Sequence, residues 1–203
     1  KDLKYDKKGA INENGTLFTA YNMMQDQHIT GVPLISDKKL LTGFVTMKDL
    51  AKYMISGNRE LINTSLESII NVLEANIITK YVDNINGKIV STGYRSTTLH
   101  DEVKLCKEDI LIVGDRYKVL DYAIDSKIEL IILANNSNIE DDLIKKAKEN
   151  KVTIIRSNMS SFVIANRISL SNPIKSINEN NHPVTINEND FYTDFQALTS
   201  KTN

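Results

Sequence analysis

The residues of this chain best suited to chemistry are Thr46 and Asp49, which stand three positions apart where an apolar strand gives way to a helix. The sequence G-F-V-T-M-K-D-L-A-K-Y-M over residues 43–54 predicts this strand-turn-helix arrangement. A threonine at the strand end can point its hydroxyl outward, and the helix start offers unpaired N–H groups that suit a phosphate. Asp49 can accept hydrogen bonds from vicinal hydroxyls, such as those of a ribose. Together these groups would hold a nucleotide without transforming it, but the same spacing is that of an ordinary helix cap, so both interpretations stay open.

The composition indicates a globular protein and excludes several function classes. Of the 203 residues, 41% are hydrophobic and 25% are charged, which allows one or two domains with a sizeable core. The net charge of −1 gives no electrostatic attraction for nucleic acid, and no apolar run approaches the ~20 residues of a membrane span. The single cysteine, Cys106, excludes an internal disulfide and favours the reducing cytoplasm. Because the chain begins at Lys1 without a methionine, we expect it to be a piece of a longer protein.

Residues 1–57 show strand and helix patterns in alternation. The expected elements are a strand near 9–11, a helix over 16–27, strands over 30–35 and 40–46 joined by a turn at 36–39, and a helix over 47–55 that ends at Gly57. The predicted order is therefore strand, helix, strand, strand, helix.

This order, with the V-P-L-I strand and the G-F-V-T-M-K-D exit, resembles a cystathionine-β-synthase (CBS) domain. In that family two such domains pack together and bind adenine nucleotides in the cleft between them. The resemblance implies that the family's Ser/Thr-x-x-Asp pattern falls on Thr46 and Asp49. Lys48 could reach a phosphate or be an exposed helix lysine. The backbone of the implied adenine pocket comes from Gly31, Val32 and Pro33.

Residues 58–172 begin with a helix signal, in which Thr64 and Glu67 form a capping-box pattern. Gly87 then precedes an expected strand at 88–90, and residues 99–108 are ambiguous. The rest alternates regularly between strands at 110–113, 130–133 and 152–155 and helices after each strand, the last two over 139–150 and 160–168. Fully apolar strands in this rhythm predict an α/β fold with a mostly parallel sheet covered by helices.

The turns of this stretch resemble those of a DRTGG domain. V-G-D-R follows one strand, a tight turn follows the next, and S-F-V-I-A-N-R lies on the last helix. The first residue pair of the family pattern falls on Asp115 and Arg116, which could bind an anion or be a structural helix start with a surface arginine. The Thr-Gly-Gly part falls on Ala134, Asn135 and Asn136. Asparagine tolerates positive φ, so we expect the turn to survive this departure.

Residues 173–203 resemble the beginning of a second CBS domain that this chain does not complete. We expect an entry strand at 173–177, a short extended segment at 184–186 and a helix from Asp190.

A CBS domain at 1–57, a DRTGG domain at 58–172 and the start of a second CBS domain at 173–203 resemble the regulatory region of family II inorganic pyrophosphatases. The resemblance implies regulation by adenine nucleotides, namely AMP, ADP, ATP or diadenosine polyphosphates. It also implies a homodimer and a catalytic domain, outside this chain, that carries manganese or cobalt.

No catalytic constellation is expected within the chain itself. The histidines are His28, His100 and His182, each isolated in sequence, and the Asp-His-His motif of the pyrophosphatases is missing. We therefore expect no catalytic residues and no metal site here. Two alternatives to a nucleotide-binding region stay open: a dimerisation and spacer segment that has lost its ligand, and a small α/β enzyme over 58–172 acting on phosphorylated metabolites.

Overall fold

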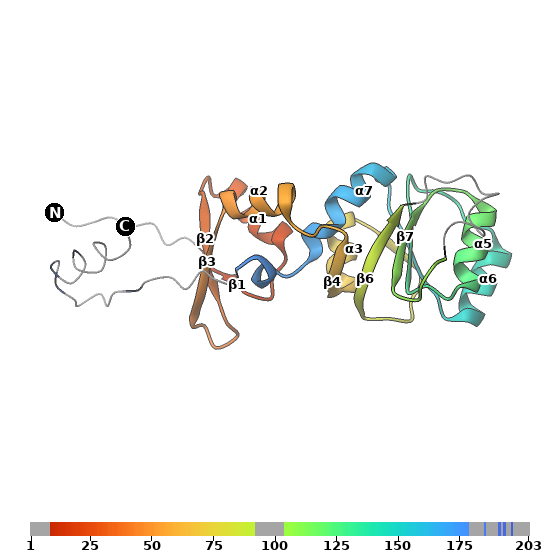
Figure 1. Ribbon diagram of the computed structural model, residues 1–203, viewed down its shortest axis with the longest axis horizontal. Helices are drawn as coiled ribbons and strands as arrows, with labels where there is room; N and C mark the ends of the chain where they lie inside the picture. The colour runs from red at the N-terminus through yellow and green to blue at the C-terminus, as the bar shows by residue number, and fades with distance from the viewer. Residues whose placement is uncertain are drawn as a thin grey trace.

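The structure, a computed structural model, describes residues 9–91 and 104–178 together with the single residues 185, 191, 193 and 196. The extended segment expected at 184–186 and the helix expected from Asp190 lie outside the described ranges. Two sheets lie one after the other along the long axis of the molecule (Figure 1). The expected α/β fold is confirmed. No helix in the described ranges is long and apolar enough to cross a membrane.

The small sheet has three strands in the order β1-β2-β3. β1 pairs parallel with β2, and β2 pairs antiparallel with β3 across a turn in which the Lys39 amide donates to the Ser36 carbonyl at 2.9 Å. Two helices cover one face of this sheet. The order strand, helix, strand, strand, helix along the chain confirms the prediction. The elements are β1 (Ile11–Asn12), α1 (Leu17–Asp26), β2 (Gly31–Ile35), β3 (Leu41–Thr46) and α2 (Met47–Ser56).

The large sheet has six strands in the order β4-β6-β7-β8-β9-β5. β6 to β9 are parallel, as predicted, while the two edge strands β4 and β5 are antiparallel to their neighbours and were not predicted. The strands are β4 (Leu61–Ser65), β5 (Asn76–Thr79), β6 (Asn84–Ser91), β7 (Asp109–Val113), β8 (Leu130–Leu133) and β9 (Thr153–Arg156).

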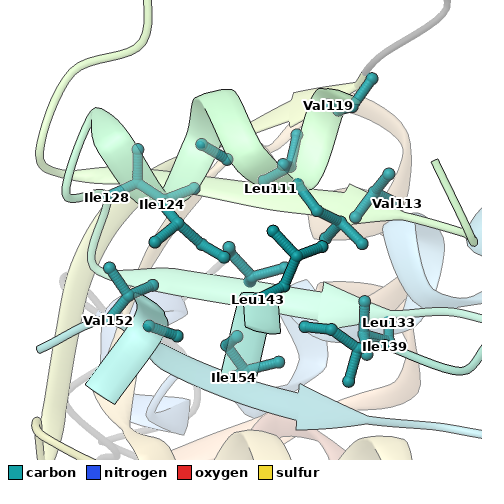
Figure 2. Close-up of a cluster of buried hydrophobic side chains, with 14 of the residues drawn as sticks. Leu111, Val113, Val119, Ile124, Ile128, Leu133, Ile139, Leu143, Val152 and Ile154 are labelled. Carbon is teal, nitrogen blue, oxygen red and sulfur yellow. The ribbon is translucent and has the colours of Figure 1, made fainter. Parts of the chain in front are cut away.

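Helices cover both faces of the large sheet, which explains why the middle residues of β7, β8 and β9 are apolar on both faces. Leu111 and Val113 of β7 face a cluster formed with α5 (Tyr117–Asp125) and α6 (Asp141–Asn150), shown in Figure 2. Ile110 and Ile112 face the opposite cluster. That cluster is covered by α3 (Leu66–Leu73), α7 (Ser161–Arg167) and the 3₁₀ helix η1 (Ile168–Ser171).

Two local predictions in this part are wrong. Helix α3 is capped by Ser65 and not by Thr64, and the Ser65 Oγ accepts from the Ser68 amide at 3.1 Å. Thr64 lies in β4 and donates its hydroxyl to the Ser171 carbonyl at 2.6 Å. Gly87 lies inside β6 rather than before it. A Cβ at this position would collide with the Glu108 carbonyl oxygen, so the glycine permits a close backbone approach within the strand.

The entry strand expected at 173–177 is also wrong. Residues Ile174–Ile177 form a 3₁₀ helix, η2, and the fully buried Ile174 packs in the core of the small sheet. The Ile174 amide donates to the Gly15 carbonyl at 2.7 Å. The segment after the large sheet thus returns to the small sheet, a long-range contact that local patterning does not reveal.

Asn172 joins the two sheets through its side-chain amide. Its Oδ1 accepts from the Asn63 amide at 2.8 Å, and its Nδ2 donates to the Leu61 carbonyl at 2.9 Å. These two bonds occupy the outer edge of β4 as a neighbouring strand would. The same Nδ2 donates to the Tyr53 hydroxyl of α2 at 3.2 Å. The side chain therefore satisfies a sheet edge and ties it to the small-sheet helix.

We predict that Asn172→Ala lowers the free energy of unfolding by about 1–3 kcal/mol, because it removes hydrogen bonds made by a side chain that is only 7% exposed. Urea denaturation followed by circular dichroism measures this change. Asn63→Ala is the matched control: its side chain is exposed, and we expect a change within about 0.5 kcal/mol. Equal effects of the two substitutions would contradict the role assigned to Asn172.

Candidate functional site

The β2–β3 hairpin brings the predicted nucleotide-binding residues together. In its register Gly31 lies opposite Thr46, and Pro33 lies opposite Phe44. Val32 and Val45 are fully buried beneath the helices, so their neighbours along each strand face the other side of the sheet. Gly31, Pro33 and Thr46 therefore share the face without helices, and Val32 can offer only its backbone there.

Thr46 and Asp49 bind each other in a complete capping box at the start of α2. The Thr46 amide and hydroxyl both donate to Asp49 Oδ2, at 2.8 and 2.6 Å, and the Asp49 amide donates to Thr46 Oγ1 at 3.2 Å. The helix-cap interpretation is therefore correct, and the Thr46 hydroxyl is engaged rather than free. Both side chains remain partly exposed. Because a carboxylate has about four lone-pair sites and both bonds end on one oxygen, Asp49 keeps capacity for further donors.

The start of α2 retains only part of its expected capacity for an anion. The Met47 amide donates to the Thr30 carbonyl at 2.8 Å, and the Asp49 amide is bound by Thr46. Lys48 stands between them with an exposed side chain. Charge attraction for a phosphate at this helix start therefore falls mainly to Lys48.

Phe44 belongs to the same face, and sequence reasoning missed it. Its side chain is 41% exposed, and its ring lies so close to Gly31 that a Cβ there would come within 2.6 Å of the ring carbon Cε1. Glycine at position 31 thus allows an aromatic ring to lie across the β2 backbone. The period-two alternation of β3 contained the signal, because it places Phe44 on the same side as Thr46.

The second pair of predicted residues, Asp115 and Arg116, follows the carboxyl end of β7. Arg116 and Asn135 line one cavity of about 460 Å³, whereas the exposed Asp115 is not among its lining residues. Asn135 and Asn136 have φ of 55° and 52°, so the expected survival of this turn is confirmed. Their amides donate to the carbonyls of Met159 and Ser157 at 2.8 and 2.9 Å, which uses these N–H groups structurally.

The tyrosine after Arg116 belongs to a polar contact between α5 and α6. The Tyr117 hydroxyl donates to Asp142 Oδ2 at 2.6 Å. This bond, aided by burial and nearby carboxylates, raises the pKa of Tyr117 to about 12, and the same bond lowers the pKa of Asp142. At neutral pH the pair is therefore a neutral phenol bound to an ionised carboxylate.

Metal-ligating side chains do not gather in the part of the chain that the structure describes. No group of three or more His, Cys, Asp or Glu residues there could hold an ion. His28 is an exposed residue after α1 with φ of 51°. His100 and His182 lie outside the described residues.

Comparison with known proteins finds a family match for each of the two sheet regions of the chain. A family model for the DRTGG domain matches residues 68–171, just over half of the chain, and one for the CBS domain matches residues 10–56. A solved structure with 23% sequence identity superposes with a TM-score of 0.86 and covers 99% of this chain and 89% of its own. It holds the CBS and DRTGG domains of the regulatory region of Clostridium perfringens pyrophosphatase, complexed with the activator diadenosine tetraphosphate.

Two relatives extend this match to complete sequences. The cobalt-dependent inorganic pyrophosphatase of Clostridium perfringens is 25% identical over 210 residues, which cover 100% of this chain and 38% of the relative. The probable manganese-dependent inorganic pyrophosphatase of Thermotoga maritima is 20% identical over 189 residues, covering 90% and 34%. The chain therefore spans little more than a third of the length of these relatives.

We predict that Thr46→Ala lowers the free energy of unfolding by about 1 kcal/mol, because it removes the side-chain half of the capping box. Thr46→Ser keeps the hydroxyl and should retain most of that free energy. Denaturant titration of the two variants beside the unchanged chain measures the difference. An alanine variant as stable as the serine variant would show that the cap adds nothing to this helix.

Proposed function

The chain belongs to the DRTGG domain family, and on that basis we propose that it is the adenine-nucleotide-binding regulatory region of an inorganic pyrophosphatase. It carries a CBS domain ahead of the DRTGG domain and is homologous to metal-dependent inorganic pyrophosphatases. Because it spans only part of those relatives, diphosphate hydrolysis and its manganese or cobalt ions belong, in this proposal, to a catalytic domain elsewhere in the polypeptide. A cytoplasmic location likewise stays a prediction.

The observation that carries the proposal is the register of the β2–β3 hairpin. Gly31 stands directly opposite Thr46, so the backbone expected to contact the base lies beside the residue that binds Asp49, whose carboxylate is expected to contact the ribose. Residues far apart in the sequence are brought together by the hairpin. In this proposal the face binds its ligand without bond cleavage, because the Thr46 hydroxyl and the Asp49 carboxylate are engaged in capping α2.

Each residue of this face has a distinct role in the proposal. The backbone of β2 at 31–33 contacts the edge of the base, and the exposed Phe44 ring stacks on its face. Asp49 accepts from the ribose hydroxyls with the lone pairs that Thr46 leaves, and Lys48 contacts a phosphate. A dinucleotide polyphosphate could extend from this hairpin to a second such site.

We predict that adenine nucleotides quench the fluorescence of a Phe44→Trp variant, because the base stacks on the new indole. The chain has no other tryptophan, so the signal reports this position alone. Adding Asp49→Asn should weaken the apparent affinity about 10- to 100-fold, the usual effect of losing hydrogen bonds to a charged group. Titration with AMP, ADP, ATP and diadenosine tetraphosphate measures both effects.

Asp26→Asn supplies the matched control, because it removes one exposed carboxylate at the far end of α1 and should leave the affinity unchanged. Saturating nucleotide at about 100 times its dissociation constant should also stabilise the unchanged chain by about 2.7 kcal/mol in thermal unfolding. The proposal is refuted if nucleotides change neither the fluorescence nor the stability, both in this chain and in the complete polypeptide.

A dimerisation and spacer role is the alternative, and two observations favour it. The capping box is complete without any ligand, so Thr46 and Asp49 need no nucleotide to be retained. In addition, a mainly apolar cavity of about 590 Å³ lies between α1 and α2, lined in part by Tyr21, Met47 and Met54. A homodimer that covers this surface would bury apolar side chains in either role.

We predict a dimer in sedimentation experiments over a range of protein concentrations, and weaker association of a Met54→Glu variant, because a charge would then be buried in the interface. Leu40→Glu, at the hairpin tip where Leu40 is 63% exposed, is the control and should associate normally. Dimerisation that ignores added nucleotide favours the spacer role, whereas dimerisation linked to nucleotide favours regulation. A monomer at every concentration contradicts the assembly part of both.

A further inference from the structure

A cavity of about 460 Å³ opens at the carboxyl edge of the parallel strands β7 and β8, away from the CBS hairpin. Ligands of open α/β sheets bind at this edge, because loops there can carry polar groups above an apolar floor. The floor here is formed by Ile112 and Ala134, which are 5% and 1% exposed. The volume lies within the range of about 300–1,000 Å³ found for small-molecule sites.

The cavity has a rigid rim, because its loop amides are already bound within the protein. Ala134 donates to the Val113 carbonyl at 2.9 Å, Asn135 to Met159 at 2.8 Å, and Ser137 to Ala134 at 3.0 Å. The turn at Asn135 is thereby fixed in a left-handed conformation with φ of 55°. A ligand would find these walls formed in advance and would not have to order them.

Polar groups from three elements meet on the cavity walls. The polar residues that line the cavity are Arg116, Asn135 and Ser161, which can offer a guanidinium, a side-chain amide and a hydroxyl. Arg116 is the one charged residue that lines the described cavity, and a guanidinium carries five N–H donors, so it can bind an anion beside a protein partner. Nearby, Asp142 is already bound by the Tyr117 hydroxyl, and Asp115 does not line the cavity.

Phe162 supplies an apolar wall that nothing in the described residues covers. It lines the cavity from α7, yet 77% of its side chain is exposed. Ala165, one turn later on α7, continues this wall. An exposed aromatic ring beside a positively charged cavity suits a ligand that has both an anionic group and a flat apolar part.

We propose that this cavity is a second ligand site, independent of the nucleotide site, and that it binds a small organic phosphate monoester. The phosphate lies on Arg116 with Asn135 and Ser161 as further donors, and the organic part lies against Phe162 and Ala165. A phosphate fits better than a carboxylate because its three outer oxygens can accept from guanidinium, amide and hydroxyl together. We propose binding without chemistry, since no base accompanies the Ser161 hydroxyl among the described residues that line the cavity.

Phenyl phosphate is the probe, because it combines a phosphate with one flat ring. We expect saturable binding by calorimetry to the whole chain, weaker binding of inorganic phosphate and none of phenol. Arg116→Gln should weaken phenyl phosphate binding about tenfold or more, as expected for loss of a charge-assisted contact. Phe162→Ala should weaken it about fivefold or more, as for a lost stacking contact, while leaving the affinity for inorganic phosphate nearly unchanged.

Two neighbours serve as matched controls. Lys118→Gln removes an exposed charge on α5, and Val163→Ala removes a side chain that is 40% exposed on α7; neither residue lines the cavity. Asp49→Asn tests independence and should leave phenyl phosphate binding intact. The proposal is overturned if phenyl phosphate does not saturate, if the controls weaken binding as much as Arg116→Gln, or if Asp49→Asn abolishes it.

Discussion

The side-chain amide of Asn172 satisfies the outer edge of β4 and holds α2 beside it, and the arrangement of the whole protein depends on this junction. An unpaired strand edge exposes backbone groups that must find partners. Here one side chain supplies both a donor and an acceptor to that edge. The next residues then enter the small-sheet core, where Ile174 is fully buried. The two sheets are therefore joined by the Asn172 hydrogen bonds and, directly after them, by the apolar packing of Ile174.

Two arginines strengthen this boundary between the sheets from opposite sides. Arg59, which follows α2, donates to Asn166 Oδ1 of α7 at 2.7 Å. Arg167, the next residue on α7, lies over the Phe18 ring of α1 at 4.6 Å from its centroid and pairs with Glu74 at 3.5 Å. Arginine suits this position because its planar group can stack and form hydrogen bonds at the same time. Movement of one sheet against the other would have to break several of these contacts together.

This boundary gives the proposed regulation a physical route. The first turn of α2 carries Asp49, and the same helix carries Tyr53, whose hydroxyl donates to Ser169 at 3.4 Å and accepts from Asn172. Helix α7 likewise carries Phe162 at the cavity and Arg167 at the boundary. A ligand at either proposed site thus contacts a helix that ends at the junction. It can shift the arrangement only by its difference in affinity for two states, typically with a coupling of about 1–3 kcal/mol.

Sequence patterns predicted the elements whose signals are local. The apolar strands β7, β8 and β9 and the helices between them followed from composition and periodicity. The turn at Asn135 and Asn136 followed from the tolerance of asparagine for positive φ. The pairing of Thr46 with Asp49 also followed from spacing, because a capping box forms within one helical turn.

By itself, then, the sequence determined the βαββα and βαβ orders and the positions of the candidate binding residues. Only the tertiary structure decided that η2 returns to the small sheet, that Phe44 lies across Gly31, and that Arg116 and Phe162 line one cavity. Periodicity reports which face of an element is apolar, but the partner of that face is chosen by contacts between residues distant in sequence. The edge strands β4 and β5 were missed for the same reason, because an edge is stabilised by its neighbour rather than by its own pattern.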